Sequence, residues 1–304
     1  MICVECTNHD IDCLYYRYKS EYITLTVCPN CEQIADRYIE YDNVILFLDI
    51  FLLKPQAYRH LAYNLTEIEM MKDSNNEVGF VKNSYWGKVQ EFMEAYLKYK
   101  KLARVVIVMI LFDVYLAWAY EEKRTQHSLI ISWILSKKIY TQYLLFIVKL
   151  IVELVAFNSS VQILLYFYHW KVRNNNMMST FPKGYQIYVI LITVLVASSI
   201  KLFPIVMLIW PYDQSIHTIK IINVIGFFNI VEALRIVTNI KYTKVITILG
   251  LSTIIQLFTT LLIVGSLVSF FSNYTLANII THEWAMTWNL IYASTYAGKN
   301  LVSG

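Results

Sequence analysis

The sequence predicts an all-α polytopic membrane protein with about five transmembrane helices, preceded by a small cysteine-bearing domain. Three observations lead to this prediction. The chain of 304 residues is 57% hydrophobic, only 16% of it is charged, and all five cysteines lie within the first 31 residues. Soluble domains carry roughly 25% charged residues. One globule cannot bury so much apolar surface, so most of the chain, whose mean hydropathy is +0.45, must lie in lipid.

The N-terminal domain is defined by two C-x-x-C pairs, Cys3 with Cys6 and Cys28 with Cys31, which are separated by 21 residues. Each pair presents two sulfurs from one tight turn, and two such turns supply the four ligands of tetrahedral Zn²⁺. The segment 14–27 between them is rich in β-favouring residues, which predicts a short hairpin. This is the spacing of a zinc ribbon. Two disulfides or four unrelated cysteines are the alternatives.

The cysteines also predict a compartment. No secretory signal peptide is recognisable before Cys3, and clustered zinc thiolates require a reducing environment. We therefore expect this domain to face the cytosol. The net charge of +4 is modest, and the lysines at 98–104 lie where a membrane begins, so they indicate a juxtamembrane anchor and not a nucleic-acid partner.

We place the zinc-ribbon domain at residues 1–65. Within it, residues 32–41 have helical spacing, and residues 44–53 form an apolar run of ten residues that ends at Lys54-Pro55. Such a run spans ~15 Å as a helix and is too short to cross a membrane. It could be a buried helix under the ribbon or an interfacial helix that seats the domain on the membrane. Residues 66–102 are predicted to be a linker and a juxtamembrane helix.

The transmembrane domain is predicted at residues 103–280, with a C-terminal tail at 281–304. We expect its spans at about 103–120, 140–170, 185–210, 218–238 and 245–271, the second with a kink or a re-entrant break at Asn158. With the N-terminus in the cytosol, the flanks on that side contain ten lysines and arginines against five on the other. Positive charge concentrates in cytoplasmic flanks, so the two arguments agree.

Ionisable side chains within these spans each cost roughly 2.5–3.5 kcal/mol on insertion scales. They are Asp113, Lys149 with Glu153, Lys201 near Pro204, and Glu232 with Arg235. They could pair between or along helices and fix the packing, or line a polar groove for a lipid headgroup.

The first 65 residues resemble the homology domain of the Arv family. The resemblance rests on the two C-x-x-C pairs, on the acidic segment 35–42, and on the stretch from Val44 through Lys54-Pro55 and Ala57-Tyr58-Arg59-His60-Leu61 to Asn64. Looser similarity recurs at 198–203, 210–213 and 229–236. Cys13 falls outside the four-ligand pattern.

The resemblance implies a multi-pass protein of the endoplasmic-reticulum membrane. It also implies roles in sterol distribution, sphingolipid balance and the synthesis of glycosylphosphatidylinositol (GPI) anchors. The expected partners are membrane lipids (sterols and GPI precursors), with enzymes of GPI biosynthesis as further candidates. The expected metal is structural zinc.

Candidate lipid contacts follow from charge and position. Tyr58, Arg59 and His60 lie just after the apolar run and could bind phosphate at the cytosolic leaflet. Alternatively, Arg59 pairs with Asp36 or Asp42 inside the domain. Lys201, close to the break that Pro204 would produce, is the candidate headgroup contact within the spans.

No pattern in the sequence predicts catalysis. A site of four sulfurs leaves zinc no open position. Asp10 and Asp12 match a D-x-D motif but lie within the ribbon, where we expect a hairpin tip. We therefore predict a non-enzymatic protein that handles lipids. The alternatives are a scaffold subunit of a GPI-synthesising complex, a zinc-dependent transferase and a solute transporter.

Overall fold

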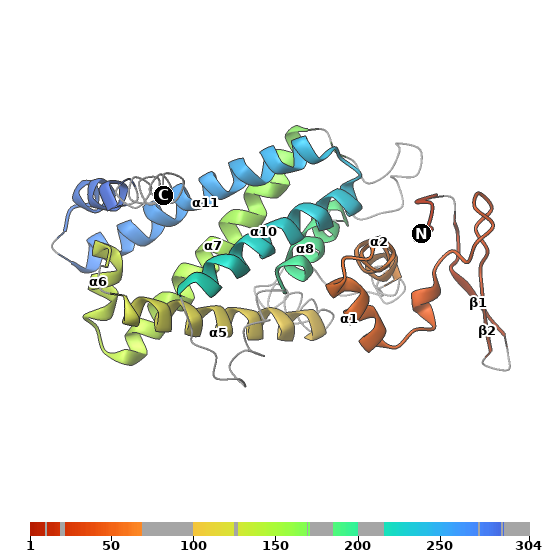
Figure 1. Ribbon diagram of the computed structural model, residues 1–304, viewed down its shortest axis with the longest axis horizontal. Coiled ribbons are helices and arrows are strands. Elements are labelled where there is room, and N and C mark those ends of the chain that lie inside the picture. Colours follow the sequence, from red (N-terminus) through yellow and green to blue (C-terminus); the bar gives the residue numbers. More distant parts are fainter. Residues whose placement is uncertain are drawn as a thin grey trace, which may run out of the picture. The chain divides into compact units, whose positions relative to one another are not determined.

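The computed structural model describes residues 1–9, 11–18, 22–68, 100–124, 127–168, 170, 185–199, 216–272, 274–286 and 288. Over these residues the chain is mostly helical and has one small sheet (Figure 1). It forms two compact units, which are described separately below. The first comprises Met1–Ile107 with Gln162–Leu249, and the second comprises Val108–Val161 with Gly250–Gly304.

The first unit begins with the predicted hairpin. Strand β1 (Tyr15–Arg17) pairs antiparallel with β2 (Ile23–Leu25), and Tyr16 lies opposite Thr24. An isolated bridge between Val27 and Ile34 follows. The hairpin prediction for residues 14–27 is therefore confirmed, and the two C-x-x-C turns flank this sheet in the sequence.

The helix predicted at residues 32–41 is wrong, because only the 3₁₀ turn η1 (Arg37–Ile39) forms there. The backbone of this segment pairs with other parts of the domain. Cys28 N donates to Gln33 O at 2.8 Å, Ala35 N to Thr26 O at 2.8 Å, and Val4 N to Ala35 O at 2.9 Å. Hydrogen bonds to neighbouring extended segments leave these groups unavailable to a helix, although the side-chain spacing permits one.

The apolar run forms the helix α1 (Asn43–Phe51), as predicted. Leu53, with a φ of 56°, reverses the chain, and Pro55 then occupies the first turn of α2 (Pro55–Arg59). Proline suits that position because its fixed φ is helical and its missing N–H would be unpaired there. Helix α2 continues into the wider π-helical turns of η2 (His60–Leu65).

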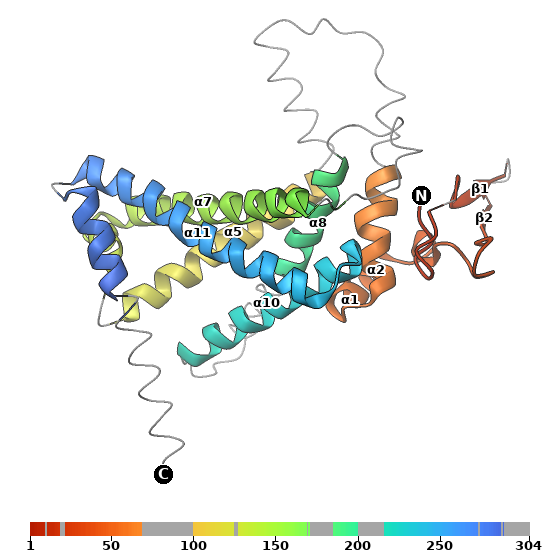
Figure 2. The same ribbon diagram turned by 90° about the horizontal axis from the view of Figure 1, so that it is seen from above.

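Two helices from later in the chain complete the first unit. Helix α8 (Tyr185–Ser198) packs along α10 (Ile216–Thr238), and Asn229 Nδ2 donates to Ala197 O between them at 2.7 Å. Helix α2 packs against α10, and η2 against α8 (Figure 2). The N-terminal domain is therefore attached to these helices through α2 and η2.

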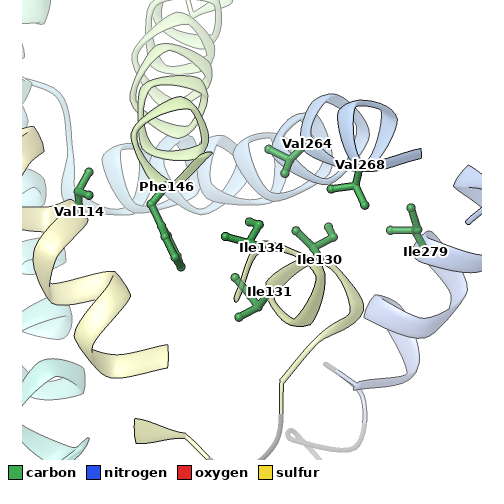
Figure 3. Packing of buried hydrophobic residues seen from close by; sticks show 8 residues of the cluster. All are labelled: Val114, Ile130, Ile131, Ile134, Phe146, Val264, Val268 and Ile279. Atoms are coloured by element: carbon green, nitrogen blue, oxygen red, sulfur yellow. The ribbon is translucent and has the colours of Figure 1, made fainter. Parts of the chain in front are cut away.

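The second unit surrounds the short helix α6 (Leu129–Leu135). Around it lie a helical segment at 276–286 and parts of α5 (Lys100–Lys123), α7 (Ile139–Phe167) and α11 (Tyr242–Phe271). Its core is entirely apolar, and Figure 3 shows the cluster: Val114, Ile130, Ile131, Ile134, Phe146, Val264, Val268 and Ile279.

A single glutamine closes the turn between α6 and α7. Gln142 Nε2 donates to Leu135 O at 2.9 Å and to Lys137 O at 2.8 Å, and its Oε1 accepts from Trp118 Nε1 at 2.9 Å. Each polar atom of this buried side chain is thereby paired, as burial requires.

Each predicted span corresponds to a helix over its described residues. Among these residues, α7 and α11 are long and apolar enough to cross a membrane, with hydropathy of 2.0 and 2.1. They indicate a membrane protein. Helix α5 includes charges at both ends, and α8 is described over only 14 residues. Five crossings, and domain boundaries at 65, 102 and 280, stay predictions.

Of the two alternatives for the second span, the re-entrant break is wrong, because α7 is one continuous helix over 29 residues; a kink at Asn158 stays a prediction. Asn158 Nδ2 donates to Leu154 O at 2.8 Å, and Ser160 Oγ donates to Phe157 O at 2.8 Å. These polar side chains bond back to their own helix. That arrangement satisfies donors without water, which is what a helix in hydrocarbon needs.

Candidate metal centre

The two C-x-x-C pairs come together as one four-sulfur cluster. The Sγ atoms of Cys3, Cys6, Cys28 and Cys31 all lie within 4.8 Å of one another. Cys3 Sγ is 3.8 Å from Cys31 Sγ, and Cys6 Sγ is 3.6 Å from Cys28 Sγ. A disulfide bond is only ~2.05 Å long. Four ligands at ~2.3 Å from a tetrahedral ion are about 3.8 Å apart, which matches these separations.

Both turns have the same backbone geometry. Thr7 N donates to Cys3 O and Glu32 N donates to Cys28 O, each at 3.0 Å. Thr7 and Glu32, each directly after the second cysteine of its pair, have left-handed φ values of 61° and 58°. This repetition explains how a short segment directs two sulfurs from each turn to one point. It also places two non-glycine residues in a conformation that favours glycine.

The environment of the sulfurs differs between the turns. Burial raises the pKa of the Cys3 thiol to about 12. Burial also opposes ionisation of Cys28, but the backbone N–H groups of Cys31 and Asn30 stabilise its thiolate and lower the pKa to about 6. A thiolate is the form that ligates a metal, so the lowered pKa of Cys28 favours its role as a ligand.

The donor set and its spacing are compatible with Zn²⁺, which the four thiolates would hold in a closed tetrahedral site. Such a site supplies folding energy and has no position for a substrate. The buried residues around it are few: Cys3, Ile11, Leu14, Cys28 and Ala35. Two of these five are candidate ligands, so the cysteine cluster is itself a large part of the core. Cys13 is exposed and outside the cluster.

A buried carboxylate next to this core joins the ribbon to the helix α2–η2. Asp36 is fully buried, and its Oδ2 lies 2.6 Å from His60 Nδ1 and accepts from Asn64 Nδ2 at 2.7 Å. Its Oδ1 accepts from the backbone N–H of Tyr38 at 3.0 Å. Asn64 also exchanges two hydrogen bonds with the backbone of Ile2, at 2.9 and 3.0 Å. The charge is thus satisfied by three donors from two elements.

Arg59 binds the first cysteine turn directly. Its Nη1 donates to Val4 O at 2.8 Å and to Glu5 O at 3.1 Å, both between Cys3 and Cys6. The Glu5 side chain in turn accepts from Arg37 at 2.6 Å and from Gln56 at 3.0 Å. Side chains from η1 and α2 therefore bind the first cysteine turn and fix its position relative to both elements.

The same helix holds the end of α10. Tyr63 Oη donates to Val237 O, and burial raises the pKa of this tyrosine well above its ordinary value. Trp170 Nε1 donates to Thr238 O at 3.0 Å. The C-terminal end of α10, Trp170 and the metal-binding domain therefore lie together.

The predicted lipid contacts have different surroundings from those expected. Tyr58 and His60 are buried, at 1% and 5% exposure. Arg59 donates its hydrogen bonds to backbone carbonyl groups, and neither Asp36 nor Asp42 is its partner. A headgroup would have to displace protein partners to reach them. Lys201 lies outside the described residues. Lipid binding by these four residues stays a prediction.

Several of the ionisable groups in the predicted spans pair along their own helix. Lys149 Nζ lies 3.2 Å from Glu153 Oε1 in α7, and Arg235 Nη1 lies 3.1 Å from Glu232 Oε1 in α10. Tyr242 Oη donates to Glu232 Oε2 at 2.8 Å, and the Arg235 guanidinium lies over the Tyr242 ring at 4.1 Å. Such local pairing reduces the cost of placing charge in a membrane.

The sequence did not predict the hydrogen bonds of His60 and Asn64 to Asp36, although the spacing of His60 and Asn64 gives a local signal. His60 and Asn64 are four apart, so they share a helix face, and a polar pair next to buried Ala57 and Tyr58 indicates a buried polar contact. The carboxylate that they bind is 24 and 28 residues away. No local spacing identifies such a partner.

Comparison with known proteins agrees with the geometry. The Arv1-like family matches residues 2–234. Protein ARV1 of Candida albicans is 47% identical over 261 residues, which are 84% of this chain and 86% of the relative. Protein ARV1 of Saccharomyces cerevisiae is 30% identical over 94% of this chain and 97% of its own. Protein ARV1 of Homo sapiens is 25% identical over 79% and 73%.

No solved structure matches the chain. The family match covers the four-cysteine cluster and α10 as far as residue 234, and α2 and η2 connect these two regions. The chain belongs to the Arv1-like family.

Proposed function

We propose that this chain is a non-enzymatic protein of the endoplasmic-reticulum membrane that handles lipids. It would distribute sterols and deliver GPI-anchor precursors, with effects on sphingolipid balance. Family membership supports a non-catalytic role, and α7 and α11 support a location in the membrane. The lipid classes come from the family resemblance.

The observation that carries the proposal is the connection between the metal-binding turns and α10. Helix α2–η2 binds Val4 and Glu5 through Arg59, and it binds Val237 at the end of α10 through Tyr63. We infer that a cytosolic zinc domain positions the C-terminal end of α10. There Glu232 and Arg235 form a partly exposed charged pair that a lipid headgroup could join.

A time course after acute removal of the protein tests this function. Labelled GPI intermediates and accessible sterol are followed in the same cells. Early accumulation of a GPI intermediate with unchanged sterol assigns the direct role to GPI delivery. Early redistribution of sterol assigns it to sterol handling. If neither pool changes before secondary lipid changes develop, the proposed function is wrong.

The alternative is a scaffold subunit of a GPI-synthesising complex, in which the helices bind protein. Exposed apolar residues of α10, such as Phe228, would then form the contact. Two variants separate the functions in complementation of cells that lack the protein. Under lipid handling, Glu232→Lys impairs function more than Phe228→Ala. Under scaffolding, the order is reversed. The double exchange E232R/R235E, which keeps the pair, controls for simple loss of fold.

A further inference from the structure

Helix α1 has its polar and apolar sides in the opposite arrangement to a surface helix in water. Its buried residues are Asp49 and Ile50. Its exposed residues are almost all large and apolar: Val44 (68% exposed), Ile45 (43%), Phe47 (60%), Leu48 (52%) and, directly after it, Leu52 (67%). A surface helix of a soluble domain normally presents charged residues outward and apolar residues to the core.

Polar contacts on the inner side fix this orientation. Asp49 Oδ1 lies 2.7 Å from Lys54 Nζ, and Asp49 Oδ2 accepts from Tyr38 Oη at 2.9 Å. Rotation of α1 to bury its apolar residues would break both contacts and expose the carboxylate instead. The apolar surface is therefore presented outward by a specific set of bonds, and α1 is held to the domain through α2.

We propose that the outer side of α1 is a membrane-docking surface that inserts into the interfacial layer of the lipid bilayer. Nine residues make a helix of ~14 Å, which cannot cross a hydrocarbon core of ~30 Å. An apolar run of this length that is not buried in a core is suited to an interfacial position.

Three observations favour lipid as the occupant. Over the described residues, two helices are long and apolar enough to cross a membrane, so a bilayer is the apolar phase that this chain itself would supply for α1. Only 22% of the most apolar segment of α7 and of α11 is buried, and α1 likewise exposes most of its apolar residues. Finally, α2 packs on both α1 and α10, and α10 also exposes apolar residues (Val224, Ile225 and Phe228). The exposed apolar surface of the unit thus extends beyond α1.

This inference depends on the membrane location but not on lipid handling. A domain can be docked on a bilayer whether the helices carry lipid or bind protein. The test therefore uses neither sterols nor GPI precursors, and its outcome is separate from that of the removal experiment above.

The experiment places p-benzoylphenylalanine, a photoreactive residue, at Phe47 or Leu52 of the full-length chain. The protein is reconstituted in phosphatidylcholine vesicles that contain radiolabelled phosphatidylcholine, and it is then irradiated. The matched control replaces Tyr22, an aromatic residue next to β2 that is 77% exposed. All three positions are exposed, so the substitutions leave the core intact.

We expect labelled lipid on the chain at positions 47 and 52, several-fold above position 22. Crosslinks from 47 and 52 to another segment of the same chain, or to a second copy, would show that protein covers α1 and would overturn the proposal. Equal, low labelling at all three positions would do the same, because it would place α1 in water.

Discussion

The metal-binding domain and the core of the second unit are stabilised in different ways. Around the four sulfurs, the buried core is small and includes two of the four clustered cysteines, and a buried carboxylate bound by His60 and Asn64 lies next to it. The cluster around Ile134 contains eight buried side chains, all apolar (Figure 3). A domain too small for its own apolar core needs a metal and a polar network, whereas helices in lipid need only close packing between them.

The largest expected effect comes from removal of the metal. Structural zinc contributes about 10–16 kcal/mol of apparent folding energy in small zinc domains. Chelation, or Cys28→Ser, should therefore unfold residues 1–68 while the second unit stays folded. Hydrogen exchange measured on both regions in the detergent-solubilised protein tests this.

Cys13→Ser is the control, because Cys13 is exposed and outside the cluster, and it should change nothing. Loss of protection in both units after chelation would contradict the distinction between them.

Removal of the buried carboxylate should have the next largest effect. Asp36→Ala leaves His60 and Asn64 without their shared acceptor, and loss of one partner of a buried charged pair costs about 3–5 kcal/mol. The expected result is loss of hydrogen-exchange protection in η2 with the zinc content unchanged. Asp42→Ala removes an exposed carboxylate that makes no capping bond and should cost less than about 0.5 kcal/mol. Similar losses in the two variants would show that the network is not a stabilising element.

A cavity in the apolar cluster should cost less. Ile134 is 1% exposed, and Ile134→Ala should destabilise the second unit by about 2 kcal/mol, the lower end of the range for buried aliphatic residues. Lipid is as apolar as the core, so mainly packing is lost. Thermal unfolding in detergent measures this, with the exposed Ile151→Ala as the comparison. A larger loss for Ile151 would place the core elsewhere.

Relief of backbone strain should act in the opposite direction. Glu32 is in the left-handed region, which costs a non-glycine residue about 1–2 kcal/mol. Glu32→Gly should therefore stabilise the zinc-bound domain by about 0.5 kcal/mol after the entropic cost of glycine. Glu40→Gly, at a φ of −94°, should destabilise it. A change of the same sign in the stability of both variants would exclude backbone conformation as the cause.

The smallest effect concerns pH. The Lys54 ammonium group and then the Tyr38 hydroxyl lower the pKa of Asp49. A lowered folded-state pKa contributes stability that is present above the unfolded value of about 3.9 and is lost as pH falls through the folded value. Acid should therefore weaken the protection of α1 against hydrogen exchange in the intact chain. Asp49→Asn should remove this dependence on pH. An unchanged acid transition in Asp49→Asn would assign it to another group.

The sequence was most informative where the evidence is local. The clustering of the four cysteines, the hairpin and the helix in the run at 44–53 each follow from neighbouring residues, and all three are confirmed. The helix predicted at 32–41 failed because Ala35 pairs with Thr26 and Val4, contacts that no helical periodicity reveals. The partners of Asp36 and Tyr63 were missed for the same reason, since His60 and Val237 are 24 and 174 residues away from them.

The exposed side of α1 could not be decided from sequence alone. A run with one acidic residue is compatible with burial and with an interfacial position. What decides its orientation is the hydrogen bond that Tyr38 Oη, in the preceding 3₁₀ turn, donates to Asp49.

Tyr58 and Tyr63 limit how far the N-terminal domain can be treated as an independent module. Both rings are buried, and α2 and η2, which carry them, pack against α10 and α8. A fragment that ends after residue 68 would expose two tyrosines to solvent while its four thiolates could still bind metal. Exchange of this domain between relatives should therefore succeed only when the sequences of α8 and α10 are exchanged with it.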